Sequence, residues 1–416
     1  MVSDNLIVGL DLGTSKVAAV ICEINDDGEI EIVGWSSVPC AGLKKGIIVD
    51  IDITVRAIEA AVRAAEKMAD VHVNSVFVSI SGEHISSLNN SGVIAVGSTT
   101  TEIGPSHIER VVEAAKAVSM NPNSEIIHIL SRDFRVDDQG GIKDPVKMSG
   151  SRLEAAVHIV MGSRAATQNV LTSVEKAGLK VADIVLSSVA SAESCLTEDD
   201  KNLGVVLVDI GAGTTDIAVF TREAIVHTAV LPVGGGHVTN DMAVGLNVTT
   251  AEAERLKLEH GVAVAEACPR SGQVIVNLDG GEKITTTAKD LVEIINPRME
   301  EIFTLVLKEI NKAGGIECIP RGVVMTGGGS RLKGCKLLAE KIFRNQDGKP
   351  LPVREGRPVH FKGLSEKINS AEYATASGLL VYGLKNTFVD DDIEEPEGFF
   401  PRAWGVVRRL FDKFFG

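Results

Sequence analysis

The sequence predicts an α/β protein of two lobes, each built on a mixed sheet flanked by helices. Two observations predict this fold. The chain has 416 residues and is 44% hydrophobic, and this length exceeds what one hydrophobic core usually organises. The order strand, turn, strand, strand, helix occurs twice, from "NLIVGLDLG" and again from "LGVVLVDIGAG". Such a duplication predicts two similar lobes related by pseudo-symmetry.

The elements of the two units follow from their local patterns. The apolar runs "NLIVGLDLG", "KVAAVICEI" and "EIEIVGWSSV" predict strands separated by turns. In "ITVRAIEAAVRAAEKMA" the apolar residues recur every three to four positions, which predicts a helix, and "VNSVFVSIS" alternates like a strand. In the second unit, the strand-like "TTDIAVFT" and "AIVHTAVLPVG" precede a helix expected from about Thr239.

Segments that interrupt or follow this repeat set the expected domain boundaries. We expect first-lobe core at 1–81 and 162–203, with a small inserted subdomain at 82–161 that contains the helical "HIERVVEAAKAVSM". We expect second-lobe core at 204–248 and 298–370, with an insertion at 249–297. A helix at 371–388 would return to the first lobe, followed by an acidic linker at 389–398 and an amphipathic helix at 399–416.

Charge and cysteine usage exclude several classes of function. A formal net charge of −14 argues against nucleic-acid binding, which needs clustered lysines and arginines. The six cysteines form no Cys-x-x-Cys pair, so neither a zinc site nor a disulfide framework is expected, and a reducing cytoplasm fits best. The segment "MVSDNLIVGLDLG" lacks the basic lead of a signal peptide, and no apolar run is long enough to span a bilayer.

Two similar turns supply candidate phosphate ligands. In "DLGTSKV" and "DIGAGTTDIAV" an acidic residue ends a strand and a glycine-rich turn follows, at the same place in each unit. Such turns bring backbone N–H groups and hydroxyls against phosphate oxygens, while the carboxylates would hold Mg²⁺ through its waters. Each turn alone also suits an ordinary hairpin. The candidates are Asp11, Gly13, Thr14, Ser15, Lys16, Asp209, Gly211, Ala212, Gly213, Thr214 and Thr215, with Asp11 and Asp209 as the Mg²⁺ residues.

A third motif, "GVVMTGGGSRLKG", is an apolar strand followed by three glycines and a helix expected to open near Ser330. The glycines would let adenine and ribose lie against the backbone, with the helix N-terminus near the nucleotide. Alone, the motif also suits the strand-to-helix turn of an ordinary α/β protein. Its candidate residues are Gly327, Gly328, Gly329 and Arg331.

The three motifs resemble those of the actin, Hsp70 and sugar-kinase superfamily, and further stretches narrow the resemblance to the FtsA family of actin-like bacterial division proteins. These stretches are "GGGHVTNDMAVGL", "AEAERLKLEHG", "GIKDPVKMSGSRLEA", "EYATASGLLVYG" and the tail after the acidic linker. The resemblance covers nearly the whole chain. It implies an actin-like fold with duplicated mixed sheets and a small extra subdomain inside the first lobe.

The resemblance also implies a function. It implies an ATP-binding protein that polymerises, tethers filaments of the tubulin-like FtsZ to the cytoplasmic face of the bacterial inner membrane at the division site, and recruits other division proteins. It places Gly235 and Gly236 near the phosphates, and Glu254 and Lys257 near the ribose. A solvated ion pair on a helix is the alternative for the last two.

The same resemblance implies that the FtsZ C-terminal peptide docks on the second insertion and the helix after it. Arg298, in "NPRMEEIF", is a plausible contact for an acidic peptide, and a solvated surface arginine is the alternative.

At most a slow ATPase is expected. Where better hydrolases of the superfamily carry Glu or Gln, this chain has Ser187 or Ser188, and a serine hydroxyl is no base at neutral pH. A small-molecule kinase of the same superfamily is one alternative function, but no motif for a catalytic Asp or a substrate pocket stands out. A pilus-type actin-like scaffold is another, and it should lack a membrane tail.

The terminal "WGVVRRLFDKFFG" is the most apolar and basic stretch of an acidic chain. On a helix its aromatic and aliphatic residues fall on one side and its bases on the other, which is typical of a helix lying in a membrane interface. A helix docked on the protein's own core is the alternative. The candidate membrane residues are Trp404, Val407, Arg408, Arg409, Leu410, Phe411, Lys413, Phe414 and Phe415.

Overall fold

The computed structural model describes residues 6–24, 30–97, 100–269, 273–278, 281–358, 361–363 and 365–387. The acidic linker expected at 389–398 and the amphipathic helix expected at 399–416, with all the candidate membrane residues, lie outside the described residues. Within the described ranges, no helix is both long and apolar enough to cross a membrane.

The first lobe is built on a six-stranded sheet. Strand β1 (Leu6–Leu12) pairs antiparallel with β2 (Lys16–Ile24), which pairs antiparallel with β3 (Ile30–Pro39). Beyond β1 come the parallel strands β6 (Ser75–Ile80) and β13 (Lys180–Leu186), and β21 (Lys362–Gly363) extends the sheet at β3. Alternate residues of β2 belong to two separate hydrophobic cores, because both faces of this sheet are covered.

The second lobe repeats this arrangement. Strands β14 (Val205–Ile210), β15 (Thr215–Thr221) and β16 (Ala224–Leu231) form an antiparallel meander. On the other side of β14 lie the parallel strands β19 (Val323–Thr326) and β20 (Val353–Glu355). The order β16-β15-β14-β19-β20 matches β3-β2-β1-β6-β13 in the first lobe, so the predicted two-lobed fold with duplicated mixed sheets is confirmed.

Four helices cover the faces of the first-lobe sheet: α1 (Ile51–Ala69), α3 (Arg164–Lys176), α4 (Ser187–Cys195) and α11 (Ala374–Thr387). The short helix α5 (Glu198–Leu203) packs on β15 of the second lobe instead. Helix α1 begins where the Asp50 side chain accepts a hydrogen bond from the Ile53 N–H, and its apolar stripe packs on β2 and β3. Helix α11 packs against α4 and β1. A Cβ on Gly378 would lie only 1.7 Å from the Ala190 carbonyl oxygen, so glycine permits this close contact.

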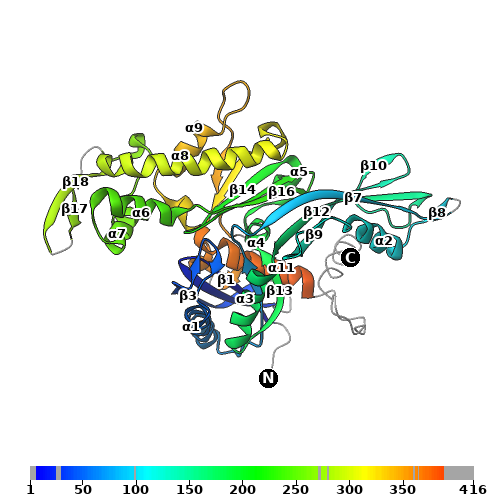
Figure 1. Ribbon diagram of the computed structural model, residues 1–416, viewed down its shortest axis with the longest axis horizontal. Helices are drawn as coiled ribbons and strands as arrows, with labels where there is room; N and C mark the ends of the chain where they lie inside the picture. The colour runs from blue at the N-terminus through cyan, green and yellow to red at the C-terminus, as the bar shows by residue number, and fades with distance from the viewer. Residues whose placement is uncertain are drawn as a thin grey trace.

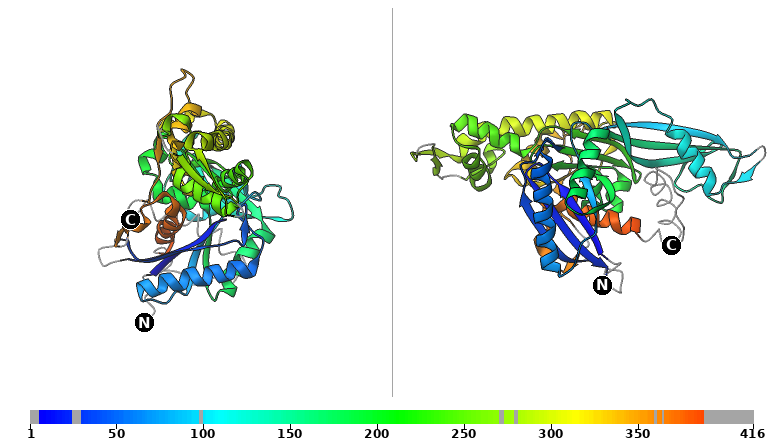
Figure 2. Two further views of the ribbon diagram at one scale, coloured as in Figure 1. Left: turned by 90° about the vertical axis from the view of Figure 1, so that its left-hand side faces the viewer. Right: turned by 60° about the horizontal axis from the view of Figure 1, so that its bottom comes forward.

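The inserted subdomain is a four-stranded antiparallel sheet in the order β10-β9-β12-β7, with α2 (Pro105–Ala115) packed on β7 and β12. Its strands are β7 (Ser86–Ala95), β9 (Ser124–Val136), β10 (Gln139–Ile142) and β12 (Arg152–Ser163), with the short pair β8 (Thr101–Glu102) and β11 (Ser149–Gly150). It has its own core, and Figures 1 and 2 show it projecting from one end of the molecule. Ser87 Oγ donates a hydrogen bond of 2.8 Å to the Thr228 carbonyl of β16, which joins it to the second lobe.

The second lobe carries the longest helix. Helix α8 (Ala288–Lys312) runs along the lobe, and α6 (Gly235–Leu246) and α7 (Thr250–His260) lie beside it (Figure 1). The hairpin β17 (Gln273–Asn277) and β18 (Lys283–Thr287) lies at the end of the molecule opposite the inserted subdomain. The remaining elements are β4 (Leu43–Lys44), β5 (Ile47–Ile48), α9 (Cys335–Ile342), α10 (Ser365–Ile368) and the 3-10 turns Ala265–Ala267, Ile316–Cys318, Gly328–Arg331 and Ala371–Tyr373.

Two expected helix starts differ from the structure. Helix α6 begins at Gly235 rather than near Thr239. The helix expected near Ser330 begins at Cys335 instead. A 3-10 turn fills Gly328–Arg331, and Gly334 must first adopt the left-handed conformation (φ 79°) before the helix can start.

Candidate functional site

A cleft of about 1320 Å³ opens between the two lobes, and the three glycine-rich motifs meet in it. All but one of the predicted nucleotide residues line this cleft. The exception is Thr215, whose side chain is completely buried and whose hydroxyl donates a hydrogen bond of 2.8 Å to the Val233 carbonyl. Thr215 thus differs from the other candidates, because its hydroxyl joins β15 to the segment before α6.

The first turn joins β1 to β2. The Gly13 N–H donates to the Lys16 carbonyl at 3.0 Å, and a Cβ on Gly13 would lie 2.9 Å from that oxygen. Thr14 and Ser15 form the tip. Thr14 Oγ1 accepts a hydrogen bond of 3.1 Å from the N–H of Gly46, so the β4–β5 loop, which the sequence did not indicate, is held at the same end of the cleft.

The second turn joins β14 to β15 and also holds the start of α6. The Gly211 N–H donates to the Thr214 carbonyl, while the N–H groups of Gly235 and Gly236 donate to the carbonyls of Gly211 and Ala212, each at 2.8 Å. Gly235 and Gly236 thus lie beside the second turn, but their N–H groups already have protein partners. A Cβ on Gly213 would lie 2.6 Å from Thr14 Oγ1, so the two turns touch across the cleft.

Three carboxyl groups gather between the turns. Each accepts a hydrogen bond from a serine hydroxyl: Asp11 Oδ1 from Ser79 Oγ (2.8 Å), Asp209 Oδ2 from Ser191 Oγ (2.6 Å) and Asp216 Oδ1 from Ser81 Oγ (2.6 Å). Burial raises the pKa of Asp11, that of Asp209 to about 6 and that of Asp216 to about 7, and mutual repulsion adds to the shifts of the last two. A cation bound beside these carboxyls would favour their charged forms and offset the cost of burying them.

The described residues contain no group of three or more His, Cys, Asp or Glu side chains placed to ligate a metal directly. Asp11 and Asp209 each have one carboxylate oxygen engaged by a hydroxyl in these contacts. This arrangement fits an Mg²⁺ ion held mainly by phosphates and water, which is how Mg²⁺ usually binds.

Two of the three predicted bases of the cleft share one acidic partner. Lys16 Nζ lies 3.6 Å from Glu372 Oε2 and 4.4 Å from the centre of the Tyr373 ring, while Arg331 Nη1 lies 2.9 Å from Glu372 Oε1. Glu372 belongs to the 3-10 turn before α11, so this segment closes one side of the cleft.

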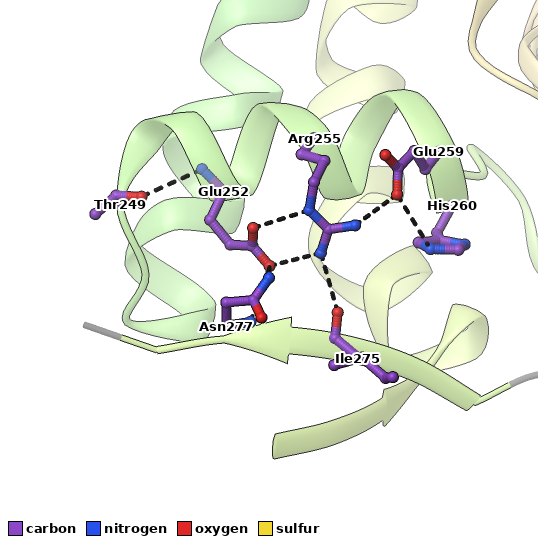
Figure 3. Close-up of polar contacts among 7 residues, drawn as sticks. All are labelled: Thr249, Glu252, Arg255, Glu259, His260, Ile275 and Asn277. Carbon is purple, nitrogen blue, oxygen red and sulfur yellow. Dashed lines mark hydrogen bonds and ion pairs between the residues drawn. The ribbon is translucent and has the colours of Figure 1, made fainter. Parts of the chain in front are cut away.

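Helix α7 forms a wall of the cleft and is fixed from behind. Figure 3 shows Arg255 bound to Glu252 and Glu259 and to the Ile275 carbonyl of β17, while Glu252 also accepts from Asn277. This network fastens one face of α7 to the hairpin.

The other face of α7 presents Glu254 and Lys257 to the cleft. The two side chains form an ion pair of 2.7 Å, and Lys257 Nζ donates to the Gly235 carbonyl (3.1 Å) and to Thr239 Oγ1 (2.8 Å). The ion pair of the alternative is thus present on α7, and the further contacts of Lys257 join α7 to the start of α6.

The glycines of the third motif have different roles. A Cβ on Gly327 would lie 2.3 Å from Asp209 Oδ1, and one on Gly329 would lie 2.6 Å from Ile210 Cγ2, so both glycines allow close packing on the end of β14. A Cβ on Gly328 would meet nothing within 4 Å. Gly328 is thus the glycine of this motif that leaves open space beside the backbone.

The serines expected in place of a catalytic Glu or Gln open α4. Ser187 lines the cleft, and its hydroxyl donates to the Ile80 carbonyl at 3.2 Å. Ser188 is completely buried, and its hydroxyl has no hydrogen-bond partner among the described residues. Only Ser187 therefore faces the cleft, and it is not a base.

Arg298 lies on α8, outside the cleft lining. Its guanidinium pairs with Asp241 of α6, with Nε 2.7 Å from Oδ2, and with Glu301 one turn along α8. Arg298 is thus a partly exposed arginine that is ion-paired within the second lobe.

Several cleft residues were missed by sequence analysis. Apart from Asp216, they lie outside the two phosphate motifs: Ser81, Lys44, Lys45, Asp216, His237, Glu372 and Thr375. For Asp216 a signal existed, since it lies within the quoted second motif, but alternation alone predicts an ordinary strand residue there.

Two family models and several known proteins match this chain. A family model described as "Cell division protein FtsA" matches residues 206–378, and one described as "SHS2 domain inserted in FTSA" matches residues 82–161. The chain is 44% identical to cell division protein FtsA of Pseudomonas aeruginosa, over 92% of this chain and 90% of that protein. It is 36% identical to the protein of that name from Escherichia coli K12, over 97% of this chain and 96% of the relative.

The fold also resembles a solved structure of a more distant protein. The PilM-PilN type IV pilus biogenesis complex matches with a TM-score of 0.64 at 17% identity, covering 91% of this chain and 98% of that one. This likeness concerns the fold.

Proposed function

Because the chain belongs to the FtsA family of cell division proteins, we propose that it binds ATP with Mg²⁺ in the interlobe cleft and links FtsZ filaments to the membrane. It is an actin-like cell division protein. The sequence identity to cell division proteins favours this function over a pilus-type scaffold or a small-molecule kinase. No described residue of the cleft specifically favours either alternative.

The contact of the two turns carries the nucleotide proposal. Thr14 and Gly213 meet where both glycine-rich turns point into the cleft, so hydroxyls and backbone of both lobes surround one volume. A polyphosphate in this volume would be held from both lobes, while Mg²⁺ would neutralise part of its charge near Asp11 and Asp209. Binding from both lobes favours one interlobe arrangement, and thereby a conformation competent to polymerise.

Calorimetric titration of the full chain with Mg-ATP tests this proposal. We expect one site per chain, and a loss of Mg²⁺ dependence in D209N, because the carboxylate beside the ion loses its charge. D347N, which neutralises an exposed Asp outside the cleft, is the matched control. Absence of ATP binding, or equal Mg²⁺ dependence in D209N and D347N, would refute the proposed site.

Hydrolysis should be slow. Ser187 is the side chain of α4 that lines the cleft in place of a Glu or Gln, and its hydroxyl is occupied by the Ile80 carbonyl. We therefore propose a mainly structural role for the nucleotide. Turnover faster than about one per second, within the ordinary enzyme range, would contradict it.

The proposed FtsZ contact lies where α8 meets α6. An acidic FtsZ C-terminal peptide would share Arg298 with Asp241 and Glu301, and such a shared guanidinium retains donors for a further carboxylate. The inserted subdomain is proposed to serve self-association and other division partners.

The terminal segment 399–416 is proposed to lie on the cytoplasmic face of the inner membrane at the division site. Each of its bases would add about 1 kcal/mol near anionic lipid. A single short helix gives reversible attachment, and a filament that presents many tails would attach firmly through effective concentration.

A further inference from the structure

Glu372 links a base from each lobe. Lys16, at the start of β2, belongs to the first lobe, and Arg331, in the turn after β19, belongs to the second. The Glu372 carboxylate lies 3.6 Å from the ammonium of Lys16 and 2.9 Å from the guanidinium of Arg331. All three side chains line the cleft, so one carboxylate holds two cations that belong to the proposed nucleotide site.

These two cations are two of the six bases that line the cleft, and the others are Lys44, Lys45, Lys257 and Lys333. Lys257, another base in the lining, is paired with Glu254 at 2.7 Å. The buried carboxyls of Asp11, Asp209 and Asp216 are acidic groups, so they offer the phosphates no positive partner. Two of the bases that an ATP molecule could use, Lys16 and Arg331, are therefore already paired with Glu372.

The Glu372 pairs can be exchanged. The side chains of Lys16, Arg331 and Glu372 are 24%, 51% and 34% exposed, and ion pairs in such partly hydrated positions contribute little net stability. Lys16 also lies over the Tyr373 ring at 4.4 Å, so its position does not depend on Glu372 alone.

We propose that Glu372 competes with the nucleotide phosphates for Lys16: its carboxylate pairs with Lys16 and Arg331, and it releases Lys16 when a polyphosphate binds. This inference rests on the proposed ATP site. Nothing covalent changes: one carboxylate is exchanged for phosphate oxygens around the same ammonium group. The exchange lowers ATP affinity and makes the contact between Lys16 and Arg331 through Glu372 depend on whether phosphates are present.

The test compares nucleotide affinities of the full-length wild-type chain and E372Q, which keeps the side-chain size and removes the charge. We expect E372Q to bind Mg-ATP roughly fivefold more tightly, as an interaction of unit charges across a partly hydrated cleft predicts, and to gain less for AMP. E355Q is the matched control, because Glu355 forms a comparable ion pair of 2.8 Å with Arg357 outside the cleft lining. It should leave both affinities unchanged.

A second comparison distinguishes competition between Glu372 and the phosphates for Lys16 from simple repulsion of the phosphates by the Glu372 charge. In a K16Q background the gain from E372Q should shrink, because Lys16 is no longer there to be released. An equal gain in both backgrounds, equal gains for ATP and AMP, or unchanged or weaker ATP binding by E372Q would each overturn the inference. If the wild-type chain bound no Mg-ATP, the proposed function itself would fail, and this inference with it.

Discussion

Ser81 of the first lobe donates a hydrogen bond of 2.6 Å to the carboxylate of Asp216 in the second lobe. Both residues line the cleft, and Asp216 is only 3% exposed. The contact therefore joins the two lobes at a carboxyl group whose charge is disfavoured by burial and by the neighbouring Asp209.

This contact predicts a pH dependence of stability. The pKa of Asp216 is raised to about 7, so between about pH 4 and 7 the folded chain keeps a proton that the unfolded chain has released. The contribution of Asp216 to stability is complete below that window and is lost as the pH rises through about 7. Relative to wild type, D216N should become more stable with rising pH, by up to about 1.4 kcal/mol per pH unit.

Urea unfolding at several pH values in this window, without nucleotide, measures the difference. D347N, which neutralises an exposed carboxyl, should follow the wild-type profile. Parallel profiles for D216N and wild type would show that Asp216 does not titrate as inferred.

The contact between the phosphate turns predicts an effect of G213A. A methyl group on Gly213 would lie 2.6 Å from Thr14 Oγ1 and 2.8 Å from its Cγ2, so the turns must separate. We expect Mg-ATP affinity to fall about tenfold or more, equivalent to about 1.4 kcal/mol, with little change in the melting temperature. G104A is the control, since a Cβ there meets only a His107 ring atom at 3.9 Å. Unaltered affinity in G213A would exclude this part of the cleft.

Reversing the charge of Arg298 should impair the proposed FtsZ contact. R298E would face Asp241 and Glu301 as well as an acidic peptide, so binding of the FtsZ C-terminal peptide should weaken at least tenfold, or about 1.4 kcal/mol. Fluorescence anisotropy of a labelled peptide measures this. R63E, on the exposed face of α1, is the control, and similar affinities for the two variants would place the peptide elsewhere.

Removing the terminal segment should abolish membrane attachment. A variant that ends at Asp392 lacks all the aromatic and basic residues of the tail. We expect the full-length chain, but not the shortened one, to sediment with vesicles containing anionic phospholipid, and added salt to weaken this binding. Equal sedimentation of both chains would refute the role of the tail.

The strands and helices that sequence analysis predicted best are those with strong local patterns. The apolar runs of β1 and β2 and the amphipathic period of α1 are where they were expected. The start of α9 was misplaced, because a backbone turn at Gly334 outweighs the helical pattern around Ser330. A local pattern does not reveal which of several glycines must take a left-handed conformation.

For the candidate site, too, some features follow from local sequence patterns and others depend on tertiary structure. By itself the sequence determined the two glycine-rich turns and the duplicated units, because tight turns and apolar periodicity depend on residues only a few positions apart. The tertiary structure alone decided that Thr215 faces away from the cleft, that Ser81 meets Asp216 across 135 positions of chain, and that Glu372 holds Lys16 and Arg331 together. These contacts depend on how the two lobes are placed against each other, and that placement results from the packing of the whole chain.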